Sequence, residues 1–168
     1  MDTIIIGEKA PRFTLPDLLG VFHSLDEYLG KIAILNFWSA ECDWCSRIDQ
    51  EFISYGDKWK DLVEVIWIAS NMNEPQELIK KTAAERKLLP VLLDVNQIVA
   101  DLYGAQTTPH FFVVDATGIL RYSGAWDDVT FRQRNPNQVY IPRVIEALLQ
   151  NQIPDIIQTP PYGCIIVR

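Results

Sequence analysis

Residues 31–45 are Lys-Ile-Ala-Ile-Leu-Asn-Phe-Trp-Ser-Ala-Glu-Cys-Asp-Trp-Cys, an apolar run followed at once by a C-x-x-C pair. Residues 31–38 have the length and composition of a central strand that is buried on both faces. From residue 42 to residue 59, large apolar side chains recur at intervals of four, three and four residues, which gives a helix one apolar face. These side chains are Ile48, Phe52, Tyr55 and Trp59. A buried strand therefore leads into a helix over 42–59, and the two cysteines lie at the junction.

The same alternation of strand and helix continues on both sides of this unit. Residues 8–30 carry three turn signals between short extended pieces and predict an N-terminal β-hairpin. Apolar runs and periodic stretches predict further elements: strands over 62–69, 89–94, 109–115, 119–124 and 164–167, helices capped by Asn73 and Asn96, and a helix over 139–149. Parallel strands followed by an antiparallel edge pair predict an α/β fold, with a mixed central sheet flanked by helices and a C-terminal tail.

Length and charge exclude several classes of protein. The 168 residues predict a single domain over 1–168. Fifteen basic and 22 acidic residues give a net charge of −7 with no Lys/Arg block, so we expect no nucleic-acid partner. Apolar runs fall short of the roughly 20 residues that span a bilayer. The first nine residues lack the pattern of a signal peptide, so a cytoplasmic location is expected.

The C-x-x-C pair predicts thiol chemistry. A sulfur at the first turn of a helix is close to unpaired N–H groups and to the positive end of the helix dipole, which favours a thiolate at Cys42. Cys45 lies about one turn deeper, within disulfide reach, and is expected to resolve a mixed disulfide. The alternative is half of a zinc site, but the only further soft or imidazole ligands are His23, His110 and Cys164. We therefore expect no metal.

Four segments resemble a known family. Residues 37–45 resemble the F-W-A-x-W-C-x-x-C active site of the thioredoxin superfamily, and residues 7–20 resemble the opening of its redoxin branch, the alkyl hydroperoxide reductase/thiol-specific antioxidant type. Residues 107–118 are similar to the segment that holds the cis-proline of that fold. The tail 159–166 resembles the G-C-x-I ending of a subgroup described as thioredoxin family proteins, and 122–128 also fits that subgroup. The resemblance implies a thioredoxin fold.

The resemblance also implies how a substrate is held. It places Thr108 and a cis Pro109 opposite the cysteine pair, with the backbone of Thr108 free to pair with an extended substrate segment. The alternative is a trans proline that only begins an edge strand. Trp38 and Trp44 are expected to shield the site from water and to offer an apolar lip to a partner.

Departures from the family's patterns distinguish two activities. In the P-x-x-x-T/S-x-x-C pattern of peroxiredoxins, Ser39 fits but Leu35 replaces the proline, and Pro109 replaces their peroxide-polarising arginine. We therefore predict a thiol–disulfide oxidoreductase that acts on protein disulfides, takes electrons from a dithiol partner and binds no metal, flavin or nicotinamide. The alternatives are an antioxidant thiol peroxidase and a non-catalytic, redox-sensitive binding module.

Charges around the cysteines modify this prediction. Glu41 stands where thioredoxins carry a tryptophan, and Asp43 lies between the sulfurs. Both carboxylates are expected to raise the pKa of Cys42 against the effect of the helix, which favours reduction or exchange over oxidation. Asp43 is alternatively a helix cap. Asn36 replaces the carboxylate that moves the second cysteine's proton in thioredoxins, so Glu41, Asp49 or water takes that role.

The roles of several other residues stay open at this point. Cys164 is either a third redox thiol, which pairs with Cys42 or Cys45 or captures a partner, or a small buried residue of an apolar strand, the commoner role of a lone cysteine. His110 either donates a proton near the sulfurs or points away. The core is expected to contain Trp59, Trp67 and Trp126. Asp127 and Asp128 are expected to be solvated charges of a loop.

Overall fold

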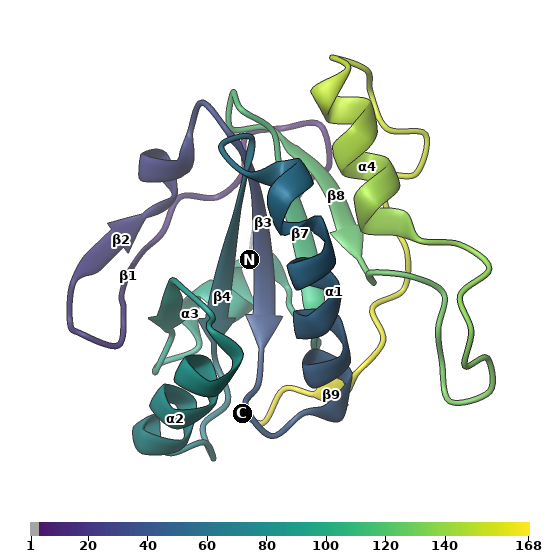
Figure 1. The fold of residues 1–168 in the computed structure, drawn as a ribbon. Coiled ribbons are helices and arrows are strands. Elements are labelled where there is room, and N and C mark those ends of the chain that lie inside the picture. Colours follow the sequence, from purple (N-terminus) through teal and green to yellow (C-terminus); the bar gives the residue numbers. More distant parts are fainter. Residues whose placement is uncertain (1–3) are drawn as a thin grey trace.

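A computed structural model describes residues 4–168, which form a five-stranded sheet with helices on both faces (Figure 1). The strand order is β5-β4-β3-β7-β8. The parallel strands β3 (Ile32–Trp38), β4 (Val63–Ala69) and β5 (Val91–Leu93) come first in the sequence. The antiparallel strands β7 (His110–Val114) and β8 (Leu120–Gly124) follow. This arrangement confirms the predicted mixed sheet of an α/β protein.

Two apolar clusters cover the two faces of the sheet, because alternate residues of a strand point to opposite sides. Helices α1 (Asp43–Trp59), α2 (Gln76–Arg86) and α4 (Tyr140–Leu149) pack in one cluster with Ile34 and Trp38. Leu35 and Phe37 face the other cluster. That second cluster includes residues of α3 (Ile98–Tyr103), of the hairpin β1 (Thr14–Pro16) and of the short 3-10 helix η1 (Leu25–Tyr28); β2 (Phe22–Ser24) completes the hairpin. All seven residues of β3 are buried, as the sequence predicted for a central strand.

The helix openings differ from the sequence prediction in two places. Helix α2 begins at Gln76 with Pro75 at its N-cap, so Asn73 does not cap it. Helix α3 begins after Gln97 and not after Asn96. The N–H groups of its second and third residues, Val99 and Ala100, donate to the carboxylate of Asp94 at 3.1 and 2.8 Å. A carboxylate at the end of the preceding strand thus satisfies the donors that a cap would otherwise serve.

The C-terminal tail crosses the molecule at the end of α1 where the two cysteines lie. Strand β9 (Cys164–Ile165) pairs antiparallel with β6 (Thr107–Thr108), so the strand in the tail is shorter than predicted. Figure 1 shows this last segment, in yellow, beside the start of α1. Further back along the tail, Thr159 hydrogen-bonds to the backbone of Ser123 at the edge of the main sheet.

Three predictions concern the chain as a whole. None of the helices in residues 4–168 combines the length and the apolar character that crossing a bilayer requires. The expectation about a signal peptide concerns in part residues 1–3, which lie outside the described residues. The single domain over 1–168 stays a prediction.

Candidate active site

The junction between β3 and α1 places Cys42 at the helix N-terminus. Cys42 is the N-cap residue, with extended backbone angles, and its carbonyl oxygen accepts the N–H of Ser46 at 3.0 Å. The helix therefore begins at Asp43, an exposed residue that does not cap it, so the capping role considered for Asp43 is wrong. The Sγ of Cys42 lies in the positive field of the helix dipole, as the sequence predicted.

Cys42 forms a disulfide with Cys164, while Cys45 is a free buried thiol. The two Cα atoms of the disulfide are 6.3 Å apart. This bond matches the open alternative in which Cys164 is a thiol that pairs with Cys42, and it forms because strand pairing carries the tail over the first cysteine. Cys164 is exposed, so its interpretation as a buried structural residue is wrong.

The register of a short β-ladder places Cys164. Thr108 is the direct partner of Cys164 between β6 and β9, and its carbonyl oxygen lies 3.0 Å from the Sγ of Cys42. The preceding residue, Gly163, passes so close to this strand that a Cβ atom on it would lie 2.1 Å from the same carbonyl oxygen. Only glycine fits this approach, which gives a physical reason for the Gly-Cys pair that the sequence carries.

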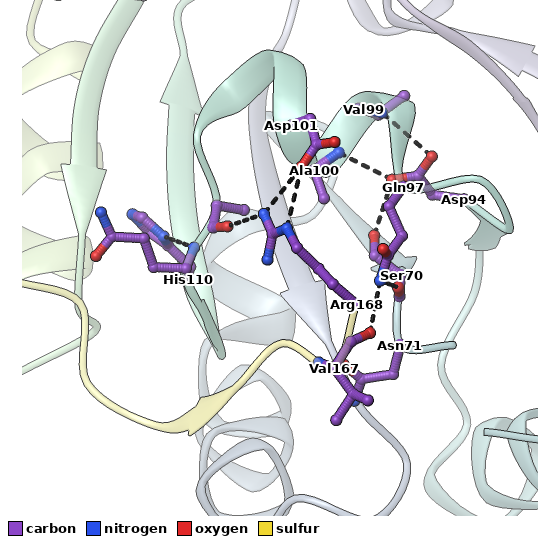
Figure 2. A network of polar contacts seen from close by, with 12 residues as sticks. Ser70, Asn71, Asp94, Gln97, Val99, Ala100, Asp101, His110, Val167 and Arg168 are labelled. Atoms are coloured by element: carbon purple, nitrogen blue, oxygen red, sulfur yellow. Dashed lines mark hydrogen bonds and ion pairs between the residues drawn. The ribbon is translucent and has the colours of Figure 1, made fainter. Parts of the chain in front are cut away.

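Polar contacts hold the tail on the far side of Cys164 (Figure 2). The guanidinium of Arg168 donates to the carboxylate of Asp101 and to the carbonyl of Ala105. The amide of Gln97 donates to the carbonyl of Val167 at 2.6 Å, and the backbone N–H of Val167 donates to the side chain of Asn71. The tail is thus fixed by contacts that do not involve the disulfide.

Cys45 lies one turn further along α1 and is fully buried. Burial raises the pKa of its thiol, and the charges of Asp49 and Glu74 add to the rise. Cys45 therefore stays protonated in this state and needs a proton acceptor before it attacks a disulfide.

Asp49 is the carboxylate that α1 places one turn beyond Cys45. It accepts hydrogen bonds from the indole N–H groups of Trp38 and Trp67 and pairs with Arg86 at 2.9 Å. Burial raises the pKa of Asp49, and these partners oppose the rise. Of the acceptors that the sequence left open, Asp49 is the buried one, whereas Glu41 is exposed.

Glu74 is a residue that the sequence reasoning missed. Its buried carboxylate comes from the loop before α2 and accepts the N–H groups of Ala40 and Glu41, both at 3.2 Å, together with the hydroxyl of Ser39. It therefore fixes the loop that leads into Cys42. No local pattern reveals this role, because the carboxylate is more than thirty residues away from the loop in the sequence.

The two tryptophans that were expected to form an apolar lip differ from each other. Trp38 is fully buried and belongs to the core, so it does not form a lip. Trp44 is half-buried, and its ring meets that of Tyr162 edge to face, with 4.9 Å between ring centroids. The protein's own tail thus packs against the tryptophan that was expected to contact a partner.

The segment around Thr108 faces the disulfide. The peptide bond between Thr108 and Pro109 is cis. The ring of His110 points into the protein, where Nδ1 accepts the N–H of Gln106 and Nε2 lies 3.2 Å from the hydroxyl of Ser123. Burial lowers the pKa of His110 to about 4. His110 is therefore a neutral supporting residue in this structure, and the proton-donor role is not supported.

Two acidic residues that were grouped as solvated loop charges have different environments. Asp127 is buried and forms a two-bond pair with Arg47 of α1, at 2.8 and 2.9 Å, so the prediction is wrong for it. Asp128 accepts the N–H groups of Asn137 and Gln138 within its own loop. Trp59, Trp67 and Trp126 pack in the core as predicted.

The zinc alternative requires further ligands beside the two cysteines. Within residues 4–168, no three His, Cys, Asp or Glu side chains are grouped so that they could hold a metal ion. The sulfur that a zinc site would require, that of Cys42, is already in a disulfide.

Comparison with known proteins agrees with this geometry. The model of the AhpC/TSA family matches residues 6–123. The thiol-disulfide oxidoreductase ResA of Geobacillus thermodenitrificans is 34% identical over 121 residues, which cover 70% of this chain and 68% of ResA. A hypothetical protein from Sinorhizobium meliloti 1021 has a similar structure, with a TM-score of 0.85 and 27% identity over 98% of this chain and 95% of that chain. An uncharacterized conserved protein from Geobacillus kaustophilus gives 0.88 and 26%, over 98% and 92% of the two chains.

The fold and the site define a thioredoxin-like redoxin. The chain belongs to the AhpC/TSA family. Within that family it is a thiol–disulfide oxidoreductase, and peroxidase activity is not favoured. The family match ends at residue 123, so the tail that carries Cys164 lies beyond it.

Proposed function

We propose that the protein reduces or exchanges disulfides of other proteins, with Cys42 as the attacking sulfur. The observation that carries this proposal is the position of Cys42, at the N-terminus of a 17-residue helix and opposite the Thr108 carbonyl. The helix dipole stabilises the thiolate there. Cys42 already forms a disulfide within the chain. This bond supports the proposal that its sulfur can form a disulfide with another segment at this position.

The reaction proceeds through a mixed disulfide. The thiolate of Cys42 attacks one sulfur of the substrate disulfide, and the other substrate sulfur leaves as a thiolate. Cys45 then attacks the Sγ of Cys42 and releases the substrate, which has gained two electrons. A dithiol donor protein returns the enzyme to its reduced form by the same chemistry.

Asp49 is the proposed acceptor of the Cys45 proton. It is buried one helical turn away, and its raised pKa brings it closer to the range in which a carboxylate exchanges protons at neutral pH. Its partners Trp38 and Arg86 fix it in place. They are positioning residues in this proposal.

A substrate strand pairs with Thr108 next to Cys42 in this proposal, in the place that β9 occupies in the structure. A surface beside it suits a protein partner: a hollow of about 300 Å³ is bordered by Trp44, Val129 and the exposed ring of Phe131.

The expected cytoplasmic location stays a prediction, which fractionation of cells tests.

The reduction of insulin disulfides by the pre-reduced protein tests the proposal. Cys42→Ser is expected to abolish the reaction, while Cys45→Ser is expected to accumulate a mixed disulfide between Cys42 and an insulin chain. Activity that survives in Cys42→Ser would contradict the proposed role of this sulfur.

The acidity of Cys42 is a second measurable property of this site. Exposed Glu41 and Asp43 flank the cysteine, and we predict a Cys42 thiol that is less acidic than the attacking thiol of strong oxidants. Ultraviolet titration of the thiolate in the reduced protein measures the pKa. A value of about 4 or lower, in the range of strong oxidants, would contradict the prediction.

A further inference from the structure

The three cysteines of this chain differ sharply in exposure. Cys45 is fully buried, Cys42 is only 3% exposed, and Cys164 lies on the surface. The disulfide joins the nearly buried sulfur to the exposed one and leaves the deepest sulfur free. A C-x-x-C cycle alone accounts for only two of these cysteines.

We propose that Cys164 is a third redox cysteine, which carries the disulfide from the buried C-x-x-C pair to the surface, where a donor thiol reduces it. This inference rests on the proposed function, because it begins where the release of substrate leaves a disulfide between Cys42 and Cys45. The structure corresponds to the state after the transfer, with Cys42 joined to Cys164.

The transfer is an exchange with no net oxidation. The thiolate of Cys164 attacks the Sγ of Cys42, the bond between Cys42 and Cys45 breaks, and Cys45 leaves as a thiolate. The proton lost by Cys164 goes to water, and Cys45 takes one up, with Asp49 as the nearest buried carboxylate along α1. Burial favours the protonated form of Cys45, which draws the exchange towards the surface disulfide.

The donor then attacks Cys164 and not Cys42. Cys164 is exposed on β9, whereas the Sγ of Cys42 is covered by the ladder between Thr108 and the tail. The leaving group also favours this direction, because the helix N-terminus stabilises the Cys42 thiolate that departs. The donor's second thiol next attacks the mixed disulfide on Cys164, so the donor leaves oxidised and the protein has three thiols.

The contacts that hold the tail do not depend on the oxidation state of Cys164, so β9 can return to Thr108 once a substrate strand has left. On one side of Cys164, Tyr162 contacts Trp44. On the other side, Val167 and Arg168 form hydrogen bonds (Figure 2), and neither set of contacts involves the disulfide. A bond that only fastened the tail would not need the sulfur at the helix N-terminus, which is the one that attacks substrates in the proposed function.

Peptide mapping of the oxidised full-length protein gives the first test. Trypsin cleaves after Lys31, Arg47 and Arg143, so Cys42 and Cys45 share the peptide 32–47 while Cys164 lies in 144–168. After treatment of the reduced protein with diamide and alkylation of free thiols, the two peptides are expected to be linked. A bond within 32–47 and an alkylated Cys164 would overturn the proposal.

Reduced glutathione is the probe for the direction of attack. In oxidised Cys45→Ser, which keeps the disulfide between Cys42 and Cys164, a short glutathione pulse quenched with acid is expected to leave the adduct on 144–168. An adduct on 32–47 contradicts the attack on Cys164. A disulfide that resists glutathione also contradicts the proposal, because it would then be structural.

Cys164→Ser separates this proposal from the proposed function. The pre-reduced variant keeps Cys42 and Cys45, so a single turnover with insulin is expected to proceed at the wild-type rate. Reduction of its oxidised form by glutathione is expected to be at least about tenfold slower than for the wild type, because the remaining disulfide is buried. Equal rates of re-reduction would refute the relay, whereas failure of the wild type to reduce insulin would refute only the proposed function.

Discussion

The two cysteines of the disulfide, Cys42 and Cys164, are held in place by two different kinds of structure. The β3–α1 unit fixes Cys42 by continuous secondary structure: seven buried strand residues, a helix of 17 residues and an apolar cluster beneath it. The tail fixes Cys164 by a two-residue ladder and by separate side-chain contacts, several of them exposed. One sulfur is therefore held by the core of the fold, and the other by contacts that can be lost one at a time.

This difference bears on the chemistry. An attacking thiolate benefits from a rigid position at the helix terminus, while a sulfur that exchanges between partners must be able to move away from the first one. The contrast predicts that changes in the β3–α1 unit affect the whole protein, and that changes in the tail affect chiefly the disulfide.

The largest effect is expected from the disulfide, which joins the β3–α1 unit to the tail. The disulfide closes a loop between residues that are 122 positions apart, and such a loop stabilises a folded chain by on the order of 5 kcal/mol in the chain-entropy account. Urea unfolding of the oxidised and reduced wild type is expected to show this difference. Cys164→Ser is the control and is expected to show little of it. Equal unfolding midpoints for the two wild-type forms would contradict the prediction.

A change in the β3–α1 unit is expected to come next. Arg86→Met removes the guanidinium that pairs with buried Asp49 and leaves the carboxylate to two indole donors. Loss of one partner of a buried pair costs about 3 to 5 kcal/mol, measured by urea unfolding at neutral pH. The double variant with Asp49→Asn is expected to lose less than the sum of the single losses, because no buried charge remains. Additive losses would argue against the coupling.

His110, which lies directly behind the cis-proline segment, is expected to give a pH dependence. Burial lowers its pKa from 6.5 to about 4, so protonation favours the unfolded chain. The stability from the neutral ring is fully present above pH 6.5 and is lost as the pH falls towards 4, by about 3 kcal/mol in all. The free energy of unfolding of wild type and His110→Gln, compared from pH 7 to pH 4, isolates this contribution from that of the carboxylates. If the free energies of unfolding of wild type and His110→Gln changed in parallel from pH 7 to pH 4, the contribution of His110 would be excluded.

A pair of glycines gives the smallest and most direct contrast. Gly163→Ala places a Cβ against the Thr108 carbonyl, so it is expected to cost about 1 to 3 kcal/mol and to reduce the yield of the disulfide between Cys42 and Cys164. Gly56→Ala, the matched change within α1, meets no atom within 4 Å and is expected to stabilise the protein by up to about 1 kcal/mol. Peptide mapping and thermal unfolding measure the two effects. A normal disulfide yield in Gly163→Ala would contradict the tight approach.

The same contrast explains what the sequence could predict. Apolar periodicity is local, so residues 31–38 and 42–59 predicted β3 and α1 to within a residue or two. The turn and strand signals after residue 109 predicted the antiparallel pair β7 and β8 for the same reason. The position of Cys42 at the helix N-terminus followed from this pattern.

Contacts between distant residues were not predictable in this way. Glu74, in the loop before α2, holds the loop that precedes Cys42. Arg86, in α2, pairs with Asp49. The local sequence pattern around each of these two residues gives no indication of its distant partner. The pairing of Cys164 with Cys42 depends on the register of a two-residue ladder, which two residues cannot encode by periodicity. The Gly-Cys motif was the one signal of it, because the close approach at Gly163 requires a residue without a side chain.

The contact between Trp44 and Tyr162 gives the protein a built-in optical probe. The other four tryptophans are buried in the core, while the half-buried indole of Trp44 lies against the ring that precedes Gly163 in the tail. Departure of the tail would expose this indole to water and leave the surroundings of the others intact. Intrinsic fluorescence, without any added label, would then follow the movement of Cys164 in real time.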